Sequence, residues 1–423
     1  MGFFPNPHYR APPVQPVAAL DRCAAESAAG LLAQCFDYRP TRLVSLRAAA
    51  AFCGLGAIHI KDEGARLGLT SFKALGGAYA VIRLVLQQAS RQLGRAVQPG
   101  ELPRPSCGTL APPAQGCHDS AGDPDVARIA AAMVFACATD GNHGQSVAAG
   151  ARLVGARAVI FVHATVSPQR IAAIARFGAE IRVVPGSYDD AVAESARESA
   201  AHGWTLLSDT SWPGYVDVPT LVMQGYTVMV HELAQQLPAP PTHVFLHAGV
   251  GGFAAAVANC LHSAASPGPR VVVVEPQAAA CLLASARRGA RVRIADGAPT
   301  IMAMLECYEP SLVAWDILRP LASGFLDIDD AAAVAAMRLL ANPVLDSEVV
   351  LSGESGSAGL AGLLTACSDP VLRSALALDA DSRVLLFNTE SATDTERYAA
   401  AVGQQAVQVA RRAAAGGRSA AGR

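Results

Sequence analysis

A lysine at position 73 has surroundings that suggest chemistry. It lies in the segment GLTSFKALGGAY, among apolar residues and glycines, at the start of a helix predicted over residues 71–88 with Ser71 as N-cap. A buried lysine loses its charge readily, and its neutral amine can form an imine with an aldehyde. Taken alone, however, a lysine in such a place is more often a solvated residue.

Two glycine-containing turns follow predicted strands and open predicted helices. The first is ATDGNHG, which contains Asp140 and Asn142 and follows a strand over residues 133–138. The second follows a strand over residues 243–247 and consists of Gly249, Val250, Gly251, Gly252 and Phe253. Glycines let backbone N–H groups approach an anion at a helix N-terminus. The ordinary alternatives are a turn in which Asp140 caps the helix and a plain tight turn.

Further polar residues follow strands elsewhere in the chain. Asn388, Thr389 and Glu390 come after the last predicted strand, over residues 383–387, and Asp209 comes after a strand over residues 205–208. In open α/β sheets, ligands bind outside the carboxyl ends of the strands, so Asp140 and Asp209 can reach one cleft. Each of these residues also has a plain interpretation as part of a turn.

The elements that would position these residues alternate between strand and helix. Strands of four to six residues separated by helices of ten to fifteen predict an α/β fold with parallel sheets. Beyond the strands already named, strands are predicted at 57–61, 158–162, 181–184 and 270–275, and helices at 143–154, 168–177, 188–202 and 252–262.

Composition excludes several classes of function. Hydrophobic residues make up 52% of the 423 positions and charged residues 16%, so the chain can bury a large core of two domains. The net charge of −2, without a basic block, argues against nucleic acid as a partner. No long apolar run predicts a membrane span, and no secretory signal is visible. We therefore expect a cytoplasmic protein with mostly reduced cysteines and no metal site.

Taken in order, the four signals resemble a known family. A lysine in SFK, an asparagine in GNHG, a glycine-rich loop and a polar turn after the final strand are similar to the fold type II enzymes that use pyridoxal 5'-phosphate. The resemblance covers residues 38–400. It implies an α/β fold like that of the tryptophan synthase β subunit, with two lobes, twisted and mostly parallel sheets covered by helices, and the cofactor in the cleft between them.

Within that family the chain looks like the diaminopropionate ammonia-lyase branch. The similar segments include FPNPHYR, LTSFKALGGAYA, ATDGNHG, SDTSWPGY, PTIMAMLECYEPS and FNTESATD. The resemblance implies α,β-elimination that converts 2,3-diaminopropionate to pyruvate and ammonia. The alternatives are a serine or threonine dehydratase, a β-replacement enzyme, or a protein that keeps the fold without catalysis. Gln145, Met304 and Tyr308 depart from the expected pattern and leave the substrate open.

The resemblance also assigns roles to residues. Lys73 would carry the cofactor as a Schiff base, and Lys73, Asp140 and Asp209 would be catalytic. Asp140 takes the position where dehydratases have a small residue, and a carboxylate there or at Asp209 would attract the cationic β-amino group. Asn142 would bind the ring hydroxyl of the cofactor and Thr389 its ring nitrogen, while the backbone from Gly249 to Phe253 would hold its phosphate.

The expected domains follow the same resemblance. Residues 1–75 and 212–423 would form a large, discontinuous cofactor-binding domain, and residues 76–211 a small domain. The Pro- and Gly-rich segment 91–125 is interpreted as an inserted surface loop, and residues 411–423 as a disordered tail.

Two further expectations concern the substrate and the assembly. We expect a small amino acid as substrate and a homodimer, with no nucleic acid or membrane as partner.

Cys281 and Cys307 are expected to lie close in space near the mouth of the cleft. The alternative is that they are two independent buried thiols.

Overall fold

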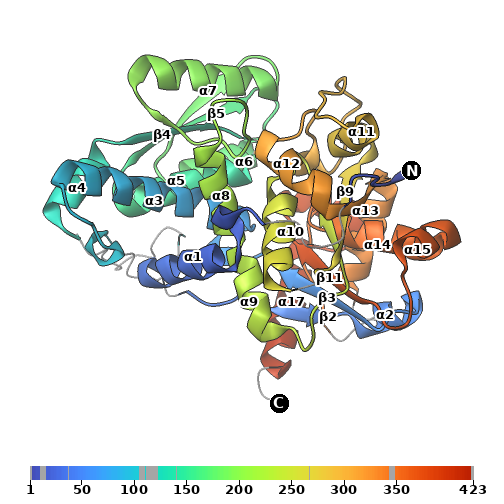
Figure 1. Ribbon diagram of the computed structural model, residues 1–423. Helices are drawn as coiled ribbons and strands as arrows, with labels where there is room; N and C mark the ends of the chain where they lie inside the picture. The colour runs from blue at the N-terminus through green and yellow to red at the C-terminus, as the bar shows by residue number, and fades with distance from the viewer. Residues whose placement is uncertain are drawn as a thin grey trace.

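The chain folds into two lobes, each built around a sheet (Figure 1). The computed structural model describes residues 2–9, 16–36, 38–103, 110, 122–139, 141–265, 267–342 and 348–420. The smaller sheet and its helices lie at the upper left of Figure 1, and the larger sheet lies at the right. The α/β architecture expected from the alternating pattern is therefore confirmed.

The larger sheet has seven strands in the order β1-β10-β9-β8-β11-β3-β2. Its central strands run parallel, while β1 and β2 at the two edges are antiparallel to their neighbours. The strands are β1 (Phe3–Pro5), β2 (Leu43–Ser45), β3 (Ala57–Asp62), β8 (His243–His247), β9 (Arg270–Pro276), β10 (Ala322–Ile328) and β11 (Arg383–Asn388). The sequence pattern missed β1, β2 and β10, because the first two have only three residues each and β10 follows a helix without an intervening turn.

The smaller sheet has four parallel strands in the order β6-β5-β4-β7. They are β4 (Val134–Ala138), β5 (Arg157–His163), β6 (Glu180–Val184) and β7 (Thr205–Leu206), and each agrees with a predicted strand. The ATDGNHG motif lies at the carboxyl end of β4, and Asp209 follows the carboxyl end of β7.

Helices cover the sheets and connect the parallel strands. In the first half of the chain they are α1 (Arg22–Cys35), α2 (Arg47–Cys53), α3 (Lys73–Leu93), α4 (Pro124–Ala131), α5 (Asn142–Val154), α6 (Pro168–Ala175) and α7 (Tyr188–His202). In the second half they are α8 (Asp217–Tyr226), α9 (Val228–Gln236), α10 (Gly252–Ala264), α11 (Cys281–Arg288), α12 (Leu312–Leu321), α13 (Asp330–Ala341), α14 (Ala358–Ser368), α15 (Pro370–Leu376), α16 (Thr395–Val402) and α17 (Ala406–Ala420).

Local sequence explains where the predicted helices begin and end. At the start of α7, the side chain of Ser187 accepts from the Asp190 N–H while the Asp190 carboxylate accepts from the Ser187 N–H, a capping box. The helix ends at Gly203, whose φ of +66° is a left-handed conformation that glycine adopts without strain. Helix α7 therefore has the bounds that the sequence predicted.

Small residues bring helices close to the large sheet. Helix α14 is buried and packs against β8, β9 and β11. A Cβ atom at Gly362 would lie 2.6 Å from the Cγ2 atom of Val274. Only glycine permits this approach of the helix backbone to the strand. The abundance of alanine and glycine thus serves the packing of helices on the sheet.

Two parts of the predicted organisation need correction. Helix α3 continues to Leu93, a short 3₁₀ turn spans Pro99–Glu101 and α4 begins at Pro124, so the segment 91–125 is not all loop; its residues 104–109 and 111–121 lie outside the described part. The segment expected to be a disordered tail contains most of α17. Alanine and arginine favour helix, and Val409 of α17 is fully buried against the protein.

The division into domains stays a proposal. The strands of the smaller sheet all lie within residues 76–211, and those of the larger sheet lie outside that range. Helix α3, which begins at Lys73, packs against both α5 and α8 and so contacts both parts.

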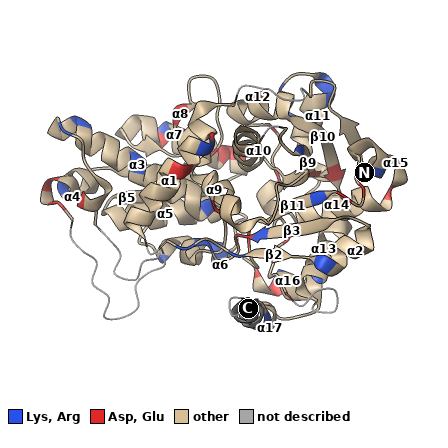
Figure 2. Cartoon of the chain, turned by 60° about the horizontal axis from the view of Figure 1, so that its bottom comes forward, with Lys and Arg blue, Asp and Glu red and all other residues tan. Residues whose placement is uncertain are grey.

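Positively and negatively charged residues are dispersed over both lobes in Figure 2. Within the described ranges, no helix is long and apolar enough to cross a membrane.

A cluster of charges is buried where β3 and the residues after it meet α9. The guanidinium of Arg66 donates to Glu63 at 2.7 Å and to Glu232 at 2.6 Å, and all three side chains are buried. Lys61 of β3 also pairs with Glu232 and donates to the Thr41 carbonyl at 2.7 Å. The cluster fixes the chain segment that leads from β3 to Lys73.

We predict that Glu232→Gln destabilises the protein strongly. Removing this carboxylate charge leaves Lys61 and Arg66 buried with only Glu63 to balance them. Breaking a buried ion pair typically costs about 3–5 kcal/mol. The free energy of unfolding from urea denaturation measures the effect.

Glu194→Gln is the matched control, because Glu194 pairs with Arg197 on the exposed face of α7. This variant should unfold at the wild-type urea concentration. An equal midpoint for wild type and Glu232→Gln would contradict the role given to the buried cluster.

Candidate active site

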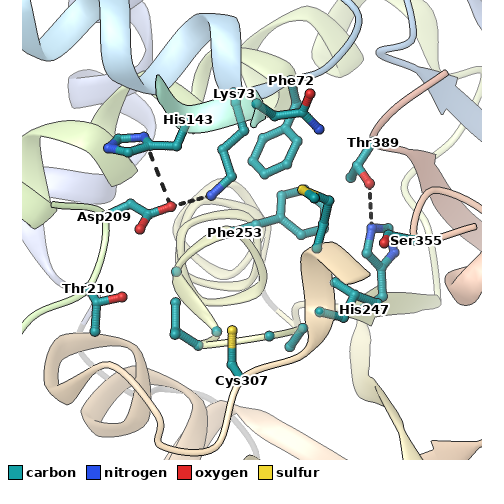
Figure 3. A pocket seen from close by; sticks show the side chains of 18 of the residues that line it. Phe72, Lys73, His143, Asp209, Thr210, His247, Phe253, Cys307, Ser355 and Thr389 are labelled. Carbon is teal, nitrogen blue, oxygen red and sulfur yellow. Dashed lines mark hydrogen bonds and ion pairs between the residues drawn. The ribbon is translucent and has the colours of Figure 1, made fainter. Parts of the chain in front are cut away.

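A cavity lies where the carboxyl ends of strands from both sheets meet (Figure 3). Its wall includes residues that follow β4, β7, β8 and β11, together with the first residue of α3. The predicted site residues found in this wall are Lys73, Asn142, Asp209, Gly249, Val250, Gly251, Gly252, Phe253 and Thr389. Asp140 lies outside the described residues.

Backbone pairing places Lys73 at the cavity. The N–H of Phe72 donates to the Thr389 carbonyl at 3.0 Å, and the N–H of Ser391 donates to the Thr70 carbonyl at 3.0 Å. The segment before α3 is thus bonded to the segment after β11. Phe72 rather than Ser71 occupies the N-cap position of α3, and no side chain caps the helix, which corrects the predicted cap.

Lys73 forms an ion pair with Asp209 inside the cavity. Its Nζ atom lies 5.4 Å from the ring centroid of Phe72 and 5.8 Å from that of Tyr226. Burial lowers the pKa of Lys73, but the carboxylate of Asp209 and the nearby Tyr226 outweigh this and leave it raised. Burial raises the pKa of Asp209, and the charge of Lys73 outweighs that and leaves it lowered. The pair is therefore an ammonium and a carboxylate.

Lys73 is also one of only two lysines in the sequence. The other, Lys61, is held in the buried cluster by Glu232, the Thr41 carbonyl and Gln236. Lys73 is thus the only lysine whose amine can react with a molecule in the cavity.

His143 is a residue of the site that sequence reasoning missed. Its Nε2 atom lies 2.9 Å from the Leu207 carbonyl and so carries the hydrogen, while its Nδ1 atom lies 4.0 Å from Oδ2 of Asp209. Burial lowers the pKa of His143 and keeps the ring neutral. Its position next to Asn142 on the first turn of α5 was the signal available in the sequence.

The turn before α5 is capped by Thr139. Its Oγ1 atom accepts from the N–H groups of Gly141 at 3.0 Å and Gly144 at 3.1 Å, and Gly141 occupies the N-cap position. The φ of Gly141 is +152°, a conformation that side chains rarely permit. The N-cap position therefore belongs to Gly141, and the alternative that concerns Asp140 lies outside the described residues.

Asn142 connects the two lobes. Its Nδ2 atom donates to Oε2 of Glu390 at 2.7 Å. This hydrogen bond joins the start of α5 to the residues that follow β11. Glu390 is buried; burial and the nearby Glu354 raise the pKa of its carboxyl group to about 7. Sequence reasoning gave Glu390 no role, although it is part of the polar turn after the last strand.

The glycine loop between β8 and α10 has the shape of an anion site. Gly251 has a φ of +95°, in the left-handed region that favours glycine, and α10 begins at Gly252. The first N–H groups of a helix lack acceptors within it, so they can bind a phosphate. A Cβ atom at Gly249 would lie 2.8 Å from Sγ of Cys307, so a larger residue would not fit.

Two cysteines lie next to this loop, and one of them, Cys307, lines the cavity. Sγ of Cys281 donates to the Gly249 carbonyl at 3.7 Å, and Cys307 contacts the same glycine. Burial raises the pKa of the Cys281 thiol. Both cysteines thus lie near the same residue, Gly249 of the glycine loop.

Thr389 and His247 form a hydrogen bond on the opposite side of the cavity from Asp209 (Figure 3). The distance from Oγ1 of Thr389 to Nε2 of His247 is 2.6 Å, and both residues are buried. Burial lowers the pKa of His247 to about 3, so the ring is neutral.

Comparisons with known proteins show the family of the chain. Residues 35–390 match the model of the family described as pyridoxal-phosphate dependent enzyme. The chain is 36% identical over 368 residues to diaminopropionate ammonia-lyase from Escherichia coli, covering 85% of this chain and 86% of that one. It is also 36% identical over 380 residues to the Salmonella typhimurium enzyme of that name, covering 86% and 87%.

A solved structure is similar along nearly the whole chain. The crystal structure of the E. coli enzyme in complex with an aminoacrylate-PLP azomethine reaction intermediate superposes with a TM-score of 0.81 at 33% identity, covering 95% of this chain and 96% of that one. The matched range contains the reactive lysine, the glycine loop and the polar turn after β11. The chain therefore belongs to the family of pyridoxal-phosphate dependent enzymes.

Proposed function

We propose that this chain is an ammonia-lyase that converts 2,3-diaminopropionate to pyruvate and ammonia. The relatives and the solved structure that support this reaction align over 85% or more of the chain. The observation in the chain itself that carries the proposal is the carboxylate of Asp209, which holds an ammonium group, that of Lys73, inside the cavity. A substrate with a cationic β-amino group needs such a partner.

Residues of one cavity would hold the cofactor. The N–H groups from Gly249 to Phe253 would bind its phosphate, Asn142 its ring hydroxyl, Thr389 its ring nitrogen and Lys73 its aldehyde carbon. The glycine loop at the start of α10 and the lysine that pairs with Asp209 fit these groups. When bound, pyridoxal phosphate withdraws electrons from Cα of an amino acid and so eases loss of the Cα proton.

Asp209 would recognise the leaving group. Its carboxylate is ionised and lies in a partly closed cavity, where attraction for a cation is stronger than in water. The β-ammonium of the substrate would take the place that the Lys73 ammonium occupies here. The β-amino group leaves as ammonia, so both its position and its proton must be controlled. Asp209, with His143 beside it, can hold the β-amino group and control its proton.

Two groups would handle the Cα proton. The neutral amine of Lys73 would remove it from one face of the substrate, and Asp140 would act on the other face for the opposite enantiomer. Loss of the β-amino group then leaves an unsaturated amine, which tautomerises and adds water to give pyruvate and a further ammonia.

Serine or threonine dehydration and β-replacement are the alternative reactions. A hydroxyl leaving group carries no charge, so it would gain little from the carboxylate of Asp209. The cytoplasmic location and the homodimer stay predictions. Sedimentation velocity of the purified protein tests whether it is a homodimer.

Lys73→Ala should abolish covalent attachment of the cofactor. Borohydride reduction of the wild-type protein with pyridoxal phosphate should add the cofactor mass to the peptide that contains Lys73 and leave the Lys61 peptide unchanged. The variant should show no labelled peptide, and pyruvate release should fall by about 10²–10⁴-fold or more. Label on Lys61 would contradict the assignment, and mass spectrometry decides it.

Asp209→Asn should weaken turnover of 2,3-diaminopropionate far more than turnover of L-serine. The amide keeps the shape of the side chain but lacks the charge that attracts the β-ammonium, so KM for both enantiomers should rise. Steady-state assays of pyruvate from D- and L-2,3-diaminopropionate, L-serine and L-threonine measure this.

The same assays test the proposed function on the wild type. The value of kcat/KM should be largest for 2,3-diaminopropionate. A larger value for L-serine or L-threonine would favour the dehydratase alternative.

Asp140→Asn should separate the two enantiomers. If Asp140 and Lys73 act on opposite faces of Cα, the variant should lose about 10²–10⁴-fold in kcat for the D substrate and much less for the L substrate. Equal losses on both substrates would remove Asp140 from the catalytic residues.

A further inference from the structure

We propose that His247 is a positioning residue that makes the Thr389 hydroxyl a hydrogen-bond donor toward the ring nitrogen of the cofactor. The inference rests on the proposed function, which places that ring against Thr389. It gives a role to His247, which the sequence motifs did not assign. It also gives the direction of the hydrogen bond between Thr389 and the ring nitrogen.

The two side chains come from neighbouring parallel strands. His247 is the last residue of β8, and Thr389 follows β11, which pairs with β8. Their side chains meet at 2.6 Å, and both line the cavity. Apart from its bond to His247, the Thr389 side chain has no hydrogen bond within the described ranges, so its hydroxyl has capacity left for a ligand.

The direction of the bond depends on which ring nitrogen of His247 carries the hydrogen. The ring packs at 5.3 Å between centroids against Phe253, and its burial keeps it neutral, with one N–H group. Its Nδ1 atom is buried and has no hydrogen-bond partner among the described residues. A hydrogen on Nδ1 would therefore be a buried donor without an acceptor.

The surroundings of Nδ1 favour a lone pair over a hydrogen. A Cβ atom at Gly359 would lie 3.5 Å from Nδ1, so this nitrogen faces the first turn of α14. The N-terminal turn of a helix carries partial positive charge, which attracts a lone pair and repels an N–H group. Buried acceptors without a partner are also tolerated better than buried donors.

The hydrogen is therefore on Nε2 and is donated to Oγ1 of Thr389. Since His247 needs Oγ1 as an acceptor, the hydrogen of the hydroxyl cannot point at His247 and must point elsewhere. Toward the cavity it can donate only to an acceptor, and a pyridine nitrogen is an acceptor only when it carries no proton. His247 thereby selects the unprotonated ring nitrogen.

The first test reads the tautomer of His247 directly. The holoenzyme labelled with ¹⁵N in its histidines should show a His247 signal with a protonated Nε2 and an unprotonated Nδ1, assigned by its loss in His247→Gln. A hydrogen on Nδ1 would overturn the proposal. If the protein does not bind pyridoxal phosphate at all, the proposed function fails, and that outcome is seen separately in the absorbance of the purified protein.

The second test is a double-mutant cycle on cofactor affinity. Titration of apoprotein with pyridoxal phosphate should give a Kd about 2- to 10-fold higher for His247→Phe and for Thr389→Val, since each loses one hydrogen bond. The double variant should be no weaker than the worse single variant, because both changes remove the same interaction. Additive losses would mean that His247 acts independently of Thr389 and would overturn the proposal.

The conservative variant gives the third readout. His247→Gln keeps an N–H group that can donate to Thr389, so it should retain the wild-type Kd. With ring-¹⁵N pyridoxal phosphate, wild type and His247→Gln should show an unprotonated, hydrogen-bonded ring nitrogen, and His247→Phe should shift that signal. An unchanged signal in folded His247→Phe would contradict the role of the histidine.

Discussion

The short backbone pairing between residues 70–72 and 389–391 is the constraint on which the site depends. It joins the start of α3, where Lys73 lies, to the residues that follow β11. Two backbone hydrogen bonds of 3.0 Å fix the spacing between the main chain at the start of α3 and the main chain at Thr389. The buried cluster around Arg66 holds the same segment from its other end.

Charge is distributed unevenly around the cavity because of this arrangement. On one side, Asp209 faces an ammonium group and a neutral histidine. On the other side, the only hydrogen bond of the Thr389 side chain within the described part is with the neutral imidazole of His247. A cation is therefore attracted to the Asp209 side, and an uncharged ring fits the Thr389 side. This asymmetry orients both the substrate and the cofactor in the proposed reaction.

The two lobes also meet through side chains. Asn142, in the lobe of the small sheet, donates to Glu390, in the lobe of the large sheet. Asn142, which is proposed to bind the cofactor, is therefore held by a residue of the other lobe. A motion of one lobe against the other would change the position of Asn142 relative to the ring.

The sequence by itself determined the parallel α/β architecture and most of the site. Alternating strands and helices, glycines at turns and a lysine in an apolar segment are local patterns. Together with the family resemblance that they carry, they predicted Lys73, Asn142, Asp209, the glycine loop and Thr389 as site residues, and all of these line the cavity. Only the tertiary structure decided which of these residues meet. Lys73 and Asp209 lie 136 positions apart, and His247 and Thr389 lie 142 apart. Hydrogen bonds between such distant residues leave no periodicity in the chain, so the partners His143, His247 and Glu390 emerged only once the strands were brought side by side. The edge strand β1 and the helix α17 were missed for a related reason, because a three-residue strand and a terminal helix are stabilised by the surface they pack on rather than by their own pattern.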